Sequence, residues 1–223
     1  MELLAQNAKM KKSSKNSEYT VYNFGIPAFM SRTGLKTCPN AGSCVAGCYA
    51  KQGAYNFSNV KNAYEERLAA TLSDNFEAMM VEAIEEKITI AEKKNKKVLI
   101  RVHDSGDFYS QEYADKWRHI ASYFNADENV HFYAYTKQVD LMKSFKYWPI
   151  NFRLVYSLGG KQDRLIDAAK DFHSRVFETK DELLRNNYAD ASDNDLVTAL
   201  GDNVKIGLVY HGSKKYSSTR WGK

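Results

Sequence analysis

The hydrophobic residues of this chain follow two periodicities that alternate along the sequence. Short runs rich in β-branched and aromatic residues predict strands at 19–24, 98–103, 130–135, 151–157, 175–177 and 204–210. Segments whose apolar residues recur every three or four positions predict helices at 60–72, 76–91, 110–124, 139–146, 162–171 and 181–186. Residues 187–203 are polar and weakly patterned, so no element is predicted there.

The alternation of strands and helices predicts an α/β fold with a parallel sheet of about six strands. Three of the expected strands have one apolar face and one face rich in polar residues. The polar faces carry Arg101 with His103, His131 with Tyr133 and Tyr135, and Arg153 with Ser157. Helices cover both faces of a doubly wound parallel sheet, so a polar face suits a barrel lumen better. We therefore expect a small or incomplete TIM-like (β/α) barrel, with a doubly wound sheet as the alternative.

Both ends of the chain are basic, and the patterned part lies between them. Residues 1–17 are interpreted as a flexible arm, 18–212 as one (β/α) barrel domain, and 213–223 as a basic tail. No apolar run approaches the length of a membrane-spanning helix, and no apolar segment follows the first lysines as in a secretory signal. The net charge of +5 fits either a solvated basic surface or a contact with nucleic acid.

All three cysteines lie in one short segment that follows the first expected strand. They are Cys38, Cys44 and Cys48, and a proline and two glycines between them favour a tightly wrapped loop. Core packing would not gather every cysteine of a chain in one place. An odd, clustered count also argues against disulfides and for a reducing compartment, the cytoplasm. The segment is therefore predicted to hold a metal ion or a cluster.

The number and softness of the ligands indicate which metal group suits three thiolates. A structural zinc site needs four ligands, so it would require a distant partner such as His103 or His211. An iron–sulfur cluster takes thiolate ligands and, with three of them, leaves one iron open to a substrate or cofactor. We expect a [4Fe–4S] cluster, and the alternatives are zinc, redox-active cysteines or plain packing.

Polar residues gather where the expected strands end, which is the edge at which α/β folds bind ligands. His103 and Asp104 could ligate the cluster or carry protons there. Lys137 could bind a carboxylate or phosphate, or else lie on the surface. Asp107 could bind an ammonium group, or else cap the following helix. The open iron is expected to face His103, Asp104, Asp107, Tyr135 and Lys137.

A cysteine loop after the first strand, followed by a helix and a strand that ends in a Gly-acid turn, resembles the radical S-adenosylmethionine superfamily. The resemblance implies a TIM-like barrel, a [4Fe–4S] cluster, and S-adenosylmethionine bound to the open iron. Ser105, Gly106 and Asp107 stand where that superfamily holds the amino group of the cofactor. Ser157 and the glycines after it could add backbone N–H groups. The cysteine spacing here is C-x5-C-x3-C, whereas the superfamily has C-x3-C-x2-C.

A second resemblance covers most of residues 19–212. The motifs that carry it lie at residues 23–28, 38–50, 101–108 and 132–137. They are similar to those of the bacteriophage "gene product 88" family, which implies a phage origin and the cytoplasm of a bacterial host. The resemblance implies little about chemistry.

Two functions of different classes follow from the sequence. The first is an iron–sulfur protein that acts on a small molecule, with S-adenosylmethionine or by Lewis-acid chemistry at the open iron. His103, Asp104 and Lys137 would be its catalytic residues. The second is a non-enzymatic protein that zinc or a cluster stabilises and whose basic ends contact nucleic acid.

Overall fold

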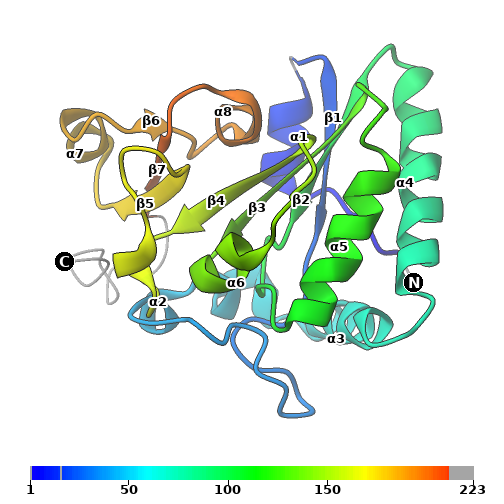
Figure 1. Ribbon diagram of the computed structural model, residues 1–223, viewed down its shortest axis with the longest axis horizontal. Coiled ribbons are helices and arrows are strands. Elements are labelled where there is room, and N and C mark those ends of the chain that lie inside the picture. The colour runs from blue at the N-terminus through cyan, green and yellow to red at the C-terminus, as the bar shows by residue number, and fades with distance from the viewer. Residues whose placement is uncertain (1, 16, 211–223) are drawn as a thin grey trace.

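Seven parallel strands form one sheet in the described part of the chain (Figure 1). The structure is a computed structural model, and it describes residues 2–15 and 17–210. The strands are β1 (Tyr19–Phe24), β2 (Lys97–Val102), β3 (Val130–Thr136), β4 (Phe152–Ser157), β5 (His173–Phe177), β6 (Ala189–Asp190) and β7 (Lys205–Val209). Their order in the sheet is β1-β2-β3-β4-β5-β7-β6, and every neighbouring pair is parallel.

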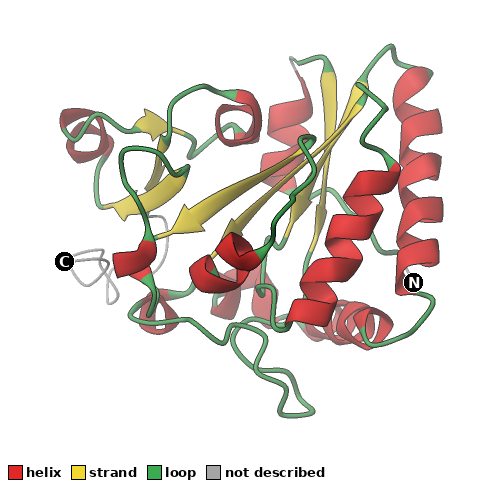
Figure 2. Ribbon diagram, in the orientation of Figure 1, coloured by secondary structure: helices red, strands yellow, loops and turns green. Residues whose placement is uncertain are grey.

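The sheet curls but does not close, as Figure 2 shows. β1 and β6 are its two edges, so the described strands form an open half-barrel. The structure confirms the α/β class and the parallel sheet, with the cysteine segment after the first strand. It does not confirm a TIM-like barrel. There are seven strands rather than about six, because the two-residue β6 forms inside the weakly patterned stretch 187–203.

Helices connect the strands and cover both faces of the sheet. In the described residues they are α1 (Ala8–Lys15), α2 (Cys44–Gly47), α3 (Ser58–Thr71), α4 (Phe76–Glu92), α5 (Gln111–Tyr123), α6 (Val139–Ser144), α7 (Lys180–Arg185) and α8 (Asp195–Leu200). Short 3₁₀ turns lie at η1 (Tyr49–Lys51), η2 (Gly53–Asn56) and η3 (Asp163–Leu165). None of these helices is long and apolar enough to cross a lipid bilayer.

Two helical predictions differ from the structure. Where a helix was expected over 162–171, only the single turn η3 forms, because Leu165 and Ile166 are too few large apolar side chains to bury a helical face. The short helix α8 forms where none was expected. Asn194 caps it by accepting a hydrogen bond from the N–H of Leu196, and its first residue, Asp195, is fully buried.

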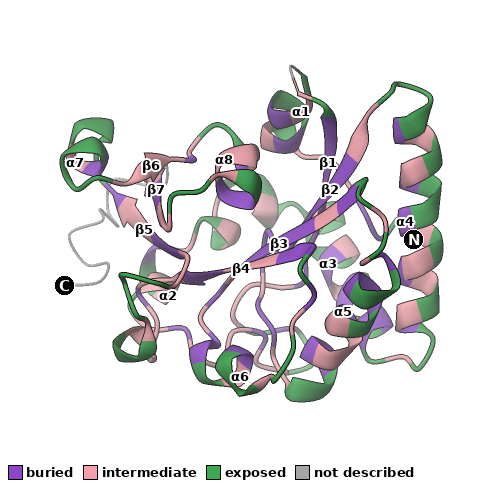
Figure 3. Cartoon of the chain, turned by 45° about the horizontal axis from the view of Figure 1, so that its top comes forward, coloured by how far each residue is buried: buried purple, intermediate pink, exposed green. Residues whose placement is uncertain are grey.

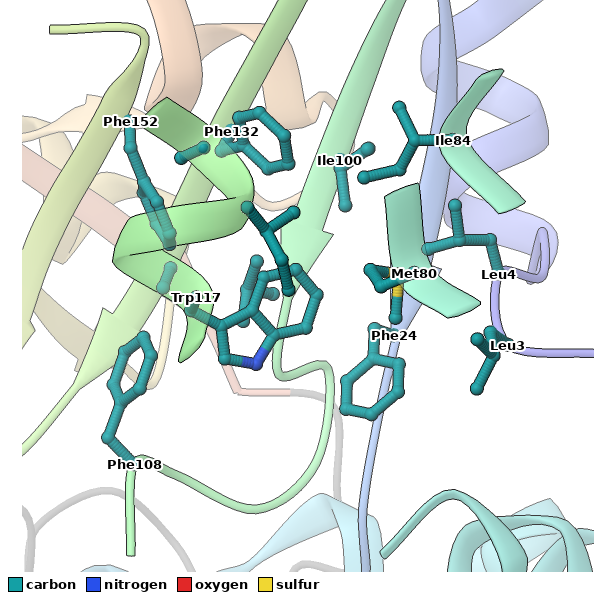
Figure 4. Close-up of a cluster of buried hydrophobic side chains, with 14 of the residues drawn as sticks. Leu3, Leu4, Phe24, Met80, Ile84, Ile100, Phe108, Trp117, Phe132 and Phe152 are labelled. Carbon is teal, nitrogen blue, oxygen red and sulfur yellow. The ribbon is translucent and has the colours of Figure 1, made fainter. Parts of the chain in front are cut away.

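The larger hydrophobic core lies between the sheet and the helices α4 and α5 (Figure 4). Phe24 of β1, Phe76 of α4 and Trp117 of α5 are all fully buried. The ring of Phe24 lies 5.2 Å from that of Trp117 and 5.8 Å from that of Phe76, measured between centroids. Burying each such side chain contributes roughly 1.5–3 kcal/mol, so this packing fixes β1 and β2 firmly against the helices.

The N-terminal segment differs from the flexible arm expected over residues 1–17. Leu3 and Leu4 are buried and reach the core beside Met80, as Figure 4 shows. Ala5 pairs with Asn23 in an antiparallel bridge that precedes α1. The many lysines of this segment conceal these few apolar residues, which are sufficient to anchor it. The predicted tail, 213–223, lies outside the described residues, as does His211.

The opposite face of the sheet carries the predicted polar side chains, but helices cover it. α1 contacts β1 and α8, and α8 contacts β3. Asp195 accepts a hydrogen bond from the Tyr133 hydroxyl at 2.5 Å and pairs with Lys9 Nζ at 3.1 Å and Arg101 Nη1 at 3.7 Å. The polar face is therefore a buried ionic network rather than an open lumen, and Figure 3 shows buried residues on the inner sides of α1 and α8.

Candidate functional site

The cysteine segment lies across the edge formed by the C-terminal ends of the strands. Ala41 pairs with Gly160 in an antiparallel bridge, and the N–H of Cys44 donates to the Gly159 carbonyl at 3.4 Å. A Cβ on Gly42 would lie 2.8 Å from that same carbonyl oxygen, so this contact requires a glycine. The loop is thus docked on the turn that follows β4, where the sequence predicted the site.

The three cysteines are free thiols of intermediate burial. The Sγ of Cys38 accepts a hydrogen bond from the Phe29 N–H at 3.3 Å. Burial raises the pKa of Cys38 to about 12, and the negative charges of Asp107, Cys48 and Cys44 contribute further. Burial likewise raises the pKa of Cys48, with a further contribution from Cys44. The three thiols therefore lie close enough to interact through their charges.

The donor set suits a soft metal group in kind and in charge. Thiolates are the ligands that zinc and iron–sulfur clusters prefer, and a bound cation would favour the ionised thiols that burial disfavours here. A backbone N–H already directed at a sulfur is a contact that tunes such centres. Within the described ranges, however, no three or more histidine, cysteine, aspartate or glutamate side chains are grouped closely enough to hold a metal ion. Binding would therefore bring the thiols closer together.

Tyr49 links the cysteine segment to the centre of the sheet. It follows Cys48 directly, and its hydroxyl donates a hydrogen bond to the backbone carbonyl of Asp104. The same hydroxyl accepts a hydrogen bond from Arg101 Nη2 at 3.1 Å. Because Arg101 also pairs with Asp195, one chain of polar contacts runs from the last cysteine to the buried network under α8.

Asp104 lies in a cage of hydrogen-bond donors. Its carboxylate accepts hydrogen bonds from Asn23 Nδ2 at 2.8 Å, from the Tyr64 hydroxyl at 3.0 Å and from the Tyr55 hydroxyl at 3.3 Å. Burial raises its pKa, and the positive charge of Arg101 and the tyrosine hydrogen bonds oppose that rise. A Cβ on Gly25 would lie 2.0 Å from the carboxylate, so the close approach of β1 depends on glycine. The cage joins β1, β2 and α3 behind the cysteine segment.

His103 does not face the cysteines, which corrects the prediction made for it. Its φ of 66° turns the backbone out of the strand geometry, and its ring lies 4.6 Å from that of Phe108 and 6.4 Å from that of Phe24. Nε2 is 2.8 Å from the Tyr113 hydroxyl, whereas Nδ1 is buried without a partner in the described residues. Burial lowers the pKa of His103 to about 3, so the ring is neutral at neutral pH.

The turn that follows β2 uses its polar groups to join neighbouring segments. The Ser105 carbonyl accepts the Ile26 N–H at 3.1 Å, and Gly106 has a φ of 83° with no room for a Cβ beside the Ile26 side chain. Asp107 accepts hydrogen bonds from the N–H of Phe108 at 2.8 Å, from the Thr136 hydroxyl at 2.7 Å and from the N–H of Lys137 at 2.9 Å.

Asp107 is the carboxylate whose charge acts on Cys38. Burial raises its own pKa to about 6, although the hydrogen bonds from Lys137, Thr136 and Phe108 oppose the rise. The cap of α5 is Ser110 rather than Asp107, because the Ser110 hydroxyl accepts the N–H of Tyr113. Asp107 therefore fastens the ends of β2 and β3 at the edge where the cysteine segment lies.

Lys137 and Ser157 are in direct contact at the same edge. The Lys137 ammonium donates to the Ser157 carbonyl at 2.9 Å, to the Ser157 hydroxyl at 2.9 Å and to the Leu158 carbonyl at 3.0 Å. Its charge also lowers the pKa of Cys48 slightly, against the larger effect of burial. Lys137 thus places a positive charge beside the thiols while it holds the end of β4.

Tyr135 lies away from the site, on the covered polar face. Its hydroxyl is 2.6 Å from the Thr198 hydroxyl of α8, and the Arg101 guanidinium lies 5.2 Å from its ring centroid. Sequence reasoning missed Asp195, the centre of that face. Its only local signal is the capping residue Asn194 before a short apolar run, and a six-residue helix carries too little periodicity to predict.

The comparison with protein families gives a match over nearly the whole chain. The model of the family described as "Gene product 88" matches residues 1–220 of this chain. No curated protein and no solved structure matches.

Proposed function

We propose that this chain, which belongs to the gene product 88 family, binds a [4Fe–4S] cluster through Cys38, Cys44 and Cys48. The observation that carries the proposal is the position of the three cysteines. They are all the cysteines of the chain, and they lie at the ligand-binding edge of a parallel sheet, where the charge of Cys44 contributes to the raised pKa of both Cys38 and Cys48. Three soft ligands favour a cluster over zinc, which takes four.

The surrounding charges support a bound cofactor. Three thiolates beside the buried carboxylate of Asp107 would concentrate negative charge. A hydrogen bond from the Ala50 N–H and, to a smaller extent, the ammonium groups of Lys51 and Lys137 lower the pKa of Cys48, but burial outweighs them. An iron–sulfur cluster supplies positive iron to these sulfurs. With three cysteine ligands, it leaves one iron able to bind and polarise a small oxygen- or nitrogen-bearing molecule.

S-adenosylmethionine has less support as the ligand of that iron. Asp107 stands where the radical superfamily holds the amino group of this cofactor, but its carboxylate already accepts three hydrogen bonds from the chain. His103, one of the expected catalytic residues, faces the apolar core instead. We therefore propose cluster binding with an open iron, with Asp107 and Lys137 beside it, and assign no S-adenosylmethionine chemistry.

Reconstitution with cysteine variants tests the proposal. The protein is incubated anaerobically with ferrous iron and sulfide, desalted, and examined for the broad absorbance near ~400 nm that marks such clusters. Cys38→Ser, Cys44→Ser and Cys48→Ser should each lose most of the absorbance, whereas the neighbouring exposed Ser43→Ala should keep it. If the cysteine variants retain as much absorbance as the unaltered chain, the proposal fails.

A further inference from the structure

Four lysines from two distant segments surround one hollow at the N-terminal edge of the sheet. Lys11 and Lys15 come from α1, and Lys94 and Lys96 come from the turn between α4 and β2. We call this group the lysine hollow. Its volume is about 260 Å³, and its other lining residues are Gln6, Ser14 and Thr20. The cysteines lie at the opposite edge, because all the strands run in parallel.

The lysine hollow gathers positive charges that do not pair with acids. Lys96 Nζ donates to the Ser14 carbonyl at 2.5 Å, which ties the turn to the last residues of α1. Lys11 and Lys15 are four positions apart on one helix, so they share a face and repel each other. Among the described residues, none of the four lysines forms an ion pair with a carboxylate. The bond from Lys96 and the negative ends of the α1 and α4 dipoles offset part of this charge, but no carboxylate of the described residues neutralises it, which suggests that an anionic ligand does.

The available donors indicate which anion would fit. Both α1 and α4 end at the lysine hollow, so no helix N-terminus directs backbone N–H groups at a single phosphate there. Gln6 donates its amide to the Val21 carbonyl at 2.8 Å, and Ser14 donates its hydroxyl to the Met10 carbonyl at 2.7 Å. Apart from the Thr20 hydroxyl, the donors that remain are ammonium groups on long side chains. Separate point charges of this kind suit successive phosphates of a polymer.

We propose that the lysine hollow binds the phosphodiester backbone of nucleic acid without reading its sequence. The contact involves neither the cysteines nor the basic tail, so it is independent of the proposed cluster. Failure of either proposal therefore leaves the other intact.

Fluorescence anisotropy with the full chain tests this contact. The probes are labelled mixed-sequence duplex DNA, single-stranded DNA and RNA, each titrated over a series of salt concentrations. The test variant is Lys11→Glu/Lys94→Glu. The control is Lys61→Glu/Lys146→Glu, which has the same net charge but changes two exposed lysines elsewhere. Lys11→Gln/Lys94→Gln, which adds no negative charge, gives the same test if the first variant does not fold.

The test variant should bind at least about tenfold more weakly than the control. The slope of log affinity against log salt should be lower in magnitude by about 1.8 for duplex DNA and by about 1.4 for single strands, since two phosphate contacts are lost at about 0.9 or 0.7 each. Both differences should persist when residues 213–223 are deleted. The probe that binds most tightly identifies the polymer. Equal binding by test and control variants, no binding of any probe at low salt, or equally tight binding of polyglutamate would overturn the proposal.

Discussion

At the scale of single residues, the cysteine site depends on side chains that hold the loop as much as on the thiols. Tyr49 and Lys137 are anchors of this kind, because each joins the edge of the site to the end of a strand. Asp107 also has two roles, since it fastens β2 to β3 and places a negative charge near Cys38. His103 packs into the core as a neutral ring among aromatic side chains.

The buried His103 should make stability depend on pH. Its pKa is lowered from 6.5 to about 3 in the folded chain, so its contribution to stability is complete above pH 6.5 and is lost as the pH falls towards 3. Between pH 7 and pH 5, the free energy of unfolding should fall by about 2 kcal/mol more in the unaltered chain than in His103→Gln. Urea unfolding at several pH values measures the difference, and parallel pH profiles would contradict this role.

Removing the Tyr49 hydroxyl should loosen the cysteine segment. Tyr49→Phe removes the hydrogen bond to the Asp104 carbonyl and the one from Arg101. The buried guanidinium of Arg101 then loses one of its hydrogen-bond acceptors. The free energy of unfolding should fall by about 1–3 kcal/mol, and reconstituted iron should be lost faster on buffer exchange. Tyr147→Phe, at a side chain that is 50% exposed, is the control. Equal stability and equal iron retention would show that Tyr49 does not anchor the segment.

At the scale of elements, the N-terminal segment and α8 together close the polar face of the half-barrel. The two elements lie far apart in the sequence, yet Lys9 and Ser13 of α1 both contact Asp195 of α8. The two edge strands, β1 and β6, would have to pair to close a barrel, and they do not pair in the described residues. Helices therefore replace the missing strands, and the face that carries Arg101 and Tyr133 is shielded from water.

The N-terminal segment should contribute strongly to stability. Leu4 is fully buried in the main core, so Leu4→Ala leaves a cavity and should lower the free energy of unfolding by about 2–5 kcal/mol. Leu72→Ala, at a side chain that is 61% exposed, should change it by less than about 0.5 kcal/mol. Chemical denaturation compares the two. If Leu4→Ala unfolds like Leu72→Ala, the segment is a loose arm after all.

Neutralising Asp195 should disrupt the covered face. Asp195→Asn leaves Lys9 and Arg101 without their buried counter-charge and should lower the free energy of unfolding by about 3–5 kcal/mol. Asp193→Asn is a matched control two residues away. Asp193 pairs with Lys12 on the surface, and breaking that exposed ion pair should lower the free energy of unfolding by less than about 1 kcal/mol. Equal effects of the two substitutions in denaturant unfolding would rule out a central role for Asp195.

Local patterns predicted the parts of the fold that depend on neighbours in the sequence. The β-branched run of β2 and the apolar stripe of α5 each marked its element to within one or two residues. The direction of His103 could not be predicted, because a positive φ at the end of a strand leaves no sign in residue type. Asp195 and Leu4 were missed since their burial depends on packing between distant segments. Of the predicted site residues, Asp107, Lys137 and Ser157 come together at the C-terminal edge, whereas His103 packs among aromatic rings and Tyr135 lies under α8.

At the scale of the whole molecule, the two edges of the parallel sheet have different character. The C-terminal edge gathers all three cysteines with Asp107 and Lys137, whereas the N-terminal edge gathers four lysines. The two proposed sites would give the chain two separate surfaces, one for a cofactor and one for a polyanion. The cofactor is the central claim, since it explains why every cysteine lies in one loop.

Metal and sulfide analysis of the full-length chain, isolated anaerobically, tests that claim most directly. Cluster binding predicts about four iron atoms and about four acid-labile sulfides per chain, with little zinc. The same analysis of Cys44→Ser should show that most of the iron is lost. A colourless protein that contains about one zinc ion per chain and no sulfide would contradict the account.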